Sequence, residues 1–162
     1  MIKSNDFSAG IKQVEHWLDL AEELQPILSQ KAKDLENAIF AKDFKQIEQV
    51  ALDFSDLNQI YYNSVGYNAW SNLLKAIDKI SGENADDPMR LAAALSSISN
   101  WSIESGNLWA IVSEANKQDE IEIDDVVADS KVILKSLKKD IANIPKMIDW
   151  LEKFLLEAAK TW

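Results

Sequence analysis

The chain has 162 residues, of which 47% are hydrophobic and 27% are charged, and its formal net charge is −10. This length suits a single domain over residues 1–162, and the composition is too apolar for a disordered chain. The absence of cysteine excludes disulfides, thiolate metal sites and cysteine nucleophiles. Because the chain has only four glycines and three prolines, long helices are expected rather than many short strands.

The first segment has apolar residues at alternate steps of four and three. Pro26 lies inside the segment, but the apolar phase continues across it. The spacing predicts one helix over 6–41 that is kinked near Pro26, with a break into two helices at the proline as the alternative. The stripe consists of Phe7, Ile11, Val14, Leu18, Ala21, Gln25, Leu28, Ala32, Leu35 and Ile39.

The second segment, 43–81, begins with Asp43 as a candidate N-cap. Its apolar stripe changes direction beyond Gly66, so one straight helix could not bury both parts against the same neighbour. The pattern therefore predicts helices over 43–65 and 67–81, with a kink or break near Gly66.

The third helix is predicted over 88–117, after the loop sequence SGENADDP. Small residues recur there every seven positions, which favours a seam for close helix packing with Ile103 and Trp109 on it or beside it. Glu104 lies opposite this predicted seam and is the one residue of the helix that we single out for a functional test. The seam residues are Ala92, Ser99, Gly106 and Ser113.

The last helix, over 124–160, follows the charged loop NKQDEIEIDD and has the most regular stripe of the chain. Pro145 falls outside this stripe, so we expect a bend rather than an end. Four long units joined by short loops predict an all-α fold, an elongated antiparallel up-down-up-down four-helix bundle. The stripe runs through Val127, Ser130, Leu134, Leu137, Ile141, Ile144, Ile148, Leu151, Leu155 and Ala158.

Groups that would support catalysis are scarce. The single histidine, His16, has Gln13 three positions before it, whereas a di-iron site needs paired Glu-x-x-His motifs. There is no G-x-S-x-G motif, and the four glycines lie too far apart to form a phosphate-binding loop. We therefore expect a protein that is not an enzyme, with no cofactor and no metal.

Two stretches are candidate partner-binding sites. The first is an acidic run, in which helix capping and the helix dipole explain only part of the charge and the spacing does not fit a calcium loop. The second is the charge-free stretch from Leu57 to Leu74, where Tyr62 and Tyr67 lie off the apolar stripes. The candidate residues of the acidic run are Asp119, Glu120, Glu122, Asp124 and Asp125, and Asp129 follows them.

Charge is unevenly distributed along the chain, with 10 Lys/Arg against 23 Asp/Glu in residues 1–130 and seven lysines against four acids in 131–160. Because residues 1–130 are strongly acidic, this part of the protein should repel nucleic acid and anionic lipid and should favour a basic protein partner. Homo-oligomers are also possible. Without an apolar N-terminal region or a long apolar run, the expected location is the cytoplasm.

These features favour an acidic helical protein that binds and inhibits another macromolecule, such as a basic toxin or a nuclease, in the manner of bacterial or phage immunity and anti-defence inhibitors. The inhibitor role is an analogy with other compact acidic proteins. Two alternatives are a structural or chaperone-like helical subunit that forms oligomers, and a sensor that binds a small ligand inside the bundle.

Overall fold

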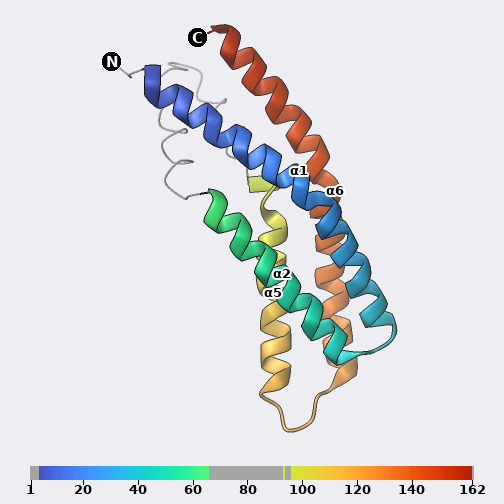
Figure 1. The fold of residues 1–162 in the computed structure, drawn as a ribbon. Helices are drawn as coiled ribbons and strands as arrows, with labels where there is room; N and C mark the ends of the chain where they lie inside the picture. The colour runs from blue at the N-terminus through green and yellow to red at the C-terminus, as the bar shows by residue number, and fades with distance from the viewer. Residues whose placement is uncertain (1–3, 66–92, 94–95, 162) are drawn as a thin grey trace.

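The computed structural model describes residues 4–65, 93 and 96–161. Within these residues the chain forms four α-helices, which pack in sequential contact as an up-down bundle (Figure 1). Helix α1 spans Ser4–Phe40, α2 spans Phe44–Val65, α5 spans Asn100–Asn116 and α6 spans Ile123–Thr161. Each helix packs against two others, α1 against α2 and α6, and α5 against α2 and α6. The predicted all-α four-helix bundle is confirmed.

Two of the three prolines lie inside continuous helices, and the third, Pro88, lies outside the described residues. Pro26 is part of α1 and Pro145 is part of α6, so neither one ends its helix. The prediction that one helix continues through each proline, over 6–41 and 124–160, is therefore confirmed, and the alternative break at Pro26 is wrong; the expected kinks at the two prolines stay predictions. In Figure 1 the first turn of α1 and the last turn of α6 lie at the same end of the bundle.

The core contains the predicted stripes of the two long helices. All the stripe positions of α6 from Val127 to Leu151 are buried, and the stripe of α1 is buried from Val14 to Ile39 apart from the half-buried Gln25. Helix α1 also buries Trp17, Leu24 and Ala38, which lie outside its predicted stripe. The wider buried face arises because α1 packs between two neighbours, α2 and α6.

The predicted helix over 88–117 is wrong in one respect, because a turn at Ile98 and Ser99 precedes α5. The turn is closed by short-range bonds: the Ser99 amide donates to Ser96 O and the Ser102 amide donates to Ser99 O, both at 3.0 Å. The Ser99 hydroxyl is 2.7 Å from the hydroxyl of Tyr61 and does not cap the helix. The Tyr61 ring in turn meets Trp101 edge to face, with centroids 5.7 Å apart. These contacts join α2 to the start of α5.

The predicted small-residue seam on α5 is wrong at Gly106, while Ser99 and Ser113 are half-buried and Ala92 lies outside the described residues. Gly106 is exposed, and a Cβ atom added there would have no neighbour within 4 Å. Ile103 and Trp109, predicted on the seam or beside it, are 63% and 40% exposed. The buried face is formed by residues that recur mostly at steps of three and four, together with Ser102, namely Ile98, Trp101, Ser102, Ser105, Leu108, Val112 and Ala115.

Several sequence predictions lie outside the described residues. They are the break near Gly66, the helix over 67–81, the loop over 81–88 and Tyr67. Tyr62 belongs to α2, but its side chain is outside the described part as well. None of the described helices combines the length and the apolar character needed to cross a bilayer.

Candidate functional site

Two connections lie at one end of the bundle, and we call them together the loop end: residues 40–43 between α1 and α2, and residues 117–122 between α5 and α6 (Figure 1). The Lys42 ammonium joins the two connections, because its Nζ lies 2.7 Å from Asp124 Oδ1 in the first turn of α6. This hydrogen bond and the lysine charge lower the pKa of Asp124. The ion pair holds the start of α6 beside the turn that follows α1.

The turn after α1 is fixed by backbone hydrogen bonds. The Lys42 amide donates to Ile39 O at 3.1 Å and the Asp43 amide donates to Ala38 O at 3.0 Å, which is the Schellman pattern of a helix C-terminus. Lys42 has a φ of 51°, at the position where glycine is most common. Asp43 then caps α2, because its carboxylate accepts from the Gln46 amide at 3.2 Å. The predicted N-cap role of Asp43 is confirmed.

The second connection contains the predicted acidic run, and all five candidate carboxylates are exposed. Asp124 and Asp125 lie in the first turn of α6, where the helix dipole favours negative charge. The carbonyl of Glu122 accepts from the amides of Asp125 and Val126, so it is the Glu122 backbone that begins the helix. Neither capping nor the dipole accounts for Asp119 and Glu120, which precede α6.

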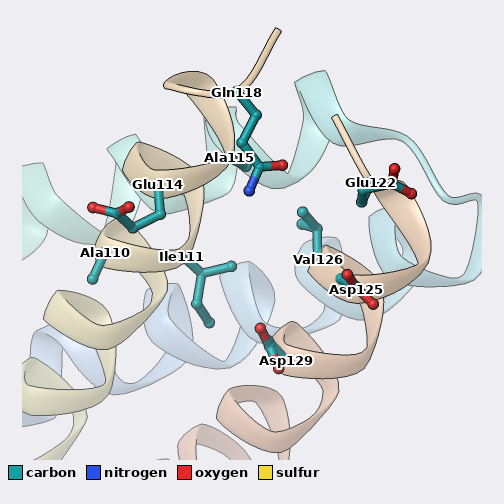
Figure 2. Close-up of a pocket in the computed structure, with 9 residues that line it drawn as sticks. All are labelled: Ala110, Ile111, Glu114, Ala115, Gln118, Glu122, Asp125, Val126 and Asp129. Atoms are coloured by element: carbon teal, nitrogen blue, oxygen red, sulfur yellow. The ribbon is translucent and has the colours of Figure 1, made fainter. Parts of the chain in front are cut away.

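A pocket of about 300 Å³ lies between the last turns of α5 and the first turns of α6. Figure 2 shows Ile111 and Val126 extending from the two helices into the space between them, with Asp125 and Asp129 on the α6 side. Glu122 and Gln118 line the pocket near the connection. Glu114 is also part of the lining, but its carboxylate is paired with Lys117 at 2.7 Å. The pocket thus has apolar side chains between the helices and carboxylates around them.

Most of these carboxylates have no basic partner among the described residues. Within the described part of the chain, Lys42 and Lys117 are the bases that form ion pairs here, with Asp124 and Glu114. The remaining acids form no ion pair with any described residue: Asp119, Glu120, Glu122, Asp125 and Asp129. Five exposed negative charges therefore remain unneutralised over a short stretch of chain. The described residues include no group of three or more His, Asp or Glu side chains placed to hold a metal ion.

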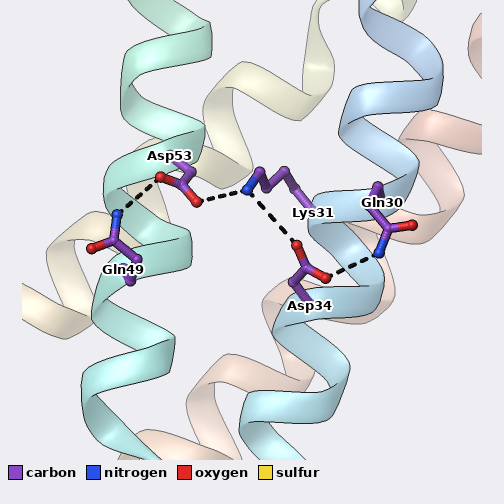
Figure 3. Close-up of polar contacts among 5 residues, drawn as sticks. All are labelled: Gln30, Lys31, Asp34, Gln49 and Asp53. Atoms are coloured by element: carbon purple, nitrogen blue, oxygen red, sulfur yellow. Dashed lines mark hydrogen bonds and ion pairs between the residues drawn. The ribbon is translucent and has the colours of Figure 1, made fainter.

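Two acids between α1 and α2, Asp53 and Asp34, show the contrast. Figure 3 shows Asp53 of α2 joined to Lys31 of α1 at 2.8 Å, while Gln49 donates to the other oxygen of the same carboxylate at 3.0 Å. Partial burial alone would raise the pKa of Asp53, but the bonds from Lys31 and Gln49 outweigh it and lower the pKa. Lys31 also approaches Asp34, at 3.8 Å. These charges are neutralised within the fold and serve helix packing.

Glu104, singled out from the sequence, is half-buried, and its charge affects the pKa of a carboxyl group on α6. Burial raises the pKa of Asp140, and the charge of Glu104 raises it further, against the opposing effect of Lys139. Two carboxylates therefore repel each other across the α5–α6 interface. His16, by contrast, is exposed on α1, as its position off the stripe predicted.

A second described pocket, of about 360 Å³, lies between α1 and α6 beside Pro145. Glu22, Gln25, Asp149 and Glu152 line it, and Asp149 is paired with Lys153 at 2.9 Å. Fewer unpaired acids surround this pocket than surround the loop end, so the loop end is the stronger candidate.

Comparisons with protein-family models, with curated proteins and with solved structures found no match for this chain.

Proposed function

We propose that this protein is an acidic, non-enzymatic helical protein that binds a basic protein partner through its loop end and thereby inhibits that partner. The observation that carries the proposal is a group of five carboxylates that form no ion pair with any described residue, beside a pocket that is partly apolar. We call them the unpaired acids: Asp119, Glu120, Glu122, Asp125 and Asp129. Inhibition of a basic toxin or nuclease remains the analogy drawn from the sequence.

Electrostatics support this surface as the place where a partner binds. Like charges held close together repel, and a cationic partner removes that repulsion while it gains favourable interactions of its own. Concentrated charge also accelerates encounter with an oppositely charged partner and gives binding that weakens as salt rises. Asp124 contributes less than its neighbours, since Lys42 already neutralises it.

The experiment measures the affinity of the protein for a synthetic lysine–serine peptide by titration calorimetry at several salt concentrations. One variant replaces the five unpaired acids by their amides and keeps the Lys42–Asp124 pair. A matched control replaces five exposed acids of α1 and α2, namely Glu15, Asp19, Glu22, Glu23 and Asp56. Each variant has a net charge of −5, which is −10 with five negative charges removed.

We expect the loop-end variant to lose at least tenfold in affinity together with most of its salt dependence, and the control variant to lose much less. Equal losses in the two variants would show that the peptide responds only to total charge, and would contradict the proposed site. Inhibition is then tested on any basic toxin or nuclease that binds the wild type, with the loop-end variant expected to leave its activity intact.

A further inference from the structure

Phe40 is an exception to the apolar pattern of the bundle. Its side chain is 91% exposed, which makes it the most exposed of the large hydrophobic side chains described, although Ile39 beside it is 4% exposed. A hydrophobic side chain on a protein surface is ordinary when it is only partly exposed and isolated. Phe40 presents nearly its whole ring to solvent, and it does so at the loop end.

The backbone at Phe40 is held in a fixed position. It is the last residue of α1, between the buried Ile39 and the turn closed by the amides of Lys42 and Asp43. Because the backbone is already ordered, only the rotamer freedom of the ring is lost when a partner covers it. Aromatic side chains of this kind are common among the few residues that dominate the energy of protein interfaces.

The residues around Phe40 indicate what kind of partner segment would bind there. Two residues further on, Lys42 is ion-paired to Asp124, which places the end of α1 beside the acidic connection. That connection also contains Ile121, which is 38% exposed between Glu120 and Glu122. The loop end thus combines exposed apolar side chains with unpaired carboxylates.

We infer that Phe40 is the apolar anchor of the loop end, and that the segment which covers it is an amphipathic basic segment with apolar side chains next to lysine or arginine. This inference rests on the proposed function and names the kind of segment bound. A purely cationic partner would leave Phe40 and Ile121 in water, and an uncharged apolar partner would leave the carboxylates unpaired. An amphipathic basic segment satisfies both groups together.

The test compares two peptides of equal charge, one of lysine and leucine that forms an amphipathic helix and one in which serine replaces every leucine. Each is titrated by calorimetry into the wild type, Phe40→Ala, Phe40→Leu, Leu156→Ala and the variant that lacks the five unpaired acids. Leu156 is 64% exposed on α6 and serves as the matched control, remote from the loop end. Circular dichroism and thermal unfolding of each variant confirm that the bundle is retained.

We expect the wild type to bind the lysine–leucine peptide at least tenfold more tightly than the lysine–serine peptide. Phe40→Ala removes most of this difference, Phe40→Leu keeps most of it, and Leu156→Ala leaves it unchanged. If Phe40→Ala matched the wild type for both peptides while binding stayed dependent on salt and on the loop-end acids, Phe40 would not be the anchor and the proposed function would stand. If the loop-end acids had no effect on either peptide, the proposed function itself would fail.

Discussion

Lys42 has a backbone conformation that costs a side-chain-bearing residue free energy. In the left-handed region the Cβ atom approaches the carbonyl oxygen, which costs about 1–2 kcal/mol for residues other than glycine. Lys42 nevertheless occupies this region, at φ 51°, and its side chain reaches Asp124 across the loop end. The ion pair gives a reason for a lysine where the turn itself favours glycine.

Two replacements of Lys42 separate the free-energy cost of its backbone conformation from the contribution of its ion pair. Lys42→Gly and Lys42→Ala both remove the contact with Asp124, but only glycine relieves the left-handed conformation. We expect Lys42→Gly to have a free energy of unfolding about 1 kcal/mol higher than that of Lys42→Ala, measured in urea. If alanine were as stable as glycine, the turn would not have the conformation described.

Asp140 gives a prediction about pH. Its pKa is raised in the folded protein by burial and by Glu104, so its contribution to stability is full below the ordinary aspartate pKa of about 4 and is lost as the pH rises through the folded-state pKa. We expect Asp140→Asn to raise the free energy of unfolding at pH 7 by a few tenths of a kcal/mol, the size of a like-charge pair on helices.

The same gain should vanish below about pH 4, where the wild-type carboxyl is already protonated. Urea unfolding of the wild type, Asp140→Asn, Glu104→Gln and the double variant at both pH values measures the coupling. A double variant equal to the sum of the two single variants at pH 7 would show that these carboxylates do not interact.

At the scale of the elements, the long helices could be predicted from the sequence and α5 could not. In α6 the apolar residues fall on one face and polar residues on the other, so only one phase buries a continuous stripe. In α5, apolar residues lie on both faces, because Ile103 and Trp109 point away from the face that holds Leu108 and Val112. The two buried positions between Trp101 and Leu108 are serines, Ser102 and Ser105, so the buried face cannot be recognised from apolar residues alone.

Gly106 tests the corrected orientation of α5. The predicted seam would place a neighbouring helix against this glycine, whereas the structure leaves open space there. We expect Gly106→Ala to raise the free energy of unfolding by about 0.5–1 kcal/mol, because alanine loses less backbone entropy in a helix. The exposed Ala110 offers the reverse control, and Ala110→Gly should destabilise by a similar amount. If Gly106→Ala were less stable than the wild type, a neighbouring helix would lie against Gly106, as the seam prediction requires.

At the scale of the whole molecule, the sequence predicts the four-helix bundle because long amphipathic helices with short connections have few other ways to bury their stripes. The acidic run could also be found from the sequence. Which of its acids is ion-paired could not be predicted, because the Lys42–Asp124 contact joins residues far apart in the chain. The same applies to Phe40: its place after a four–three stripe does not reveal that it is left exposed beyond the end of the core.

The most direct test of the proposed loop-end interface is an NMR titration of the isotope-labelled protein with the lysine–leucine peptide at low salt. We expect the largest amide chemical-shift changes in residues 37–43 and 117–129, with smaller changes along the middle of α1 and α6. The changes should disappear in the variant that lacks the five unpaired acids. Changes centred instead on Tyr62 and Tyr67, or spread evenly over the acidic surface, would contradict binding at the loop end.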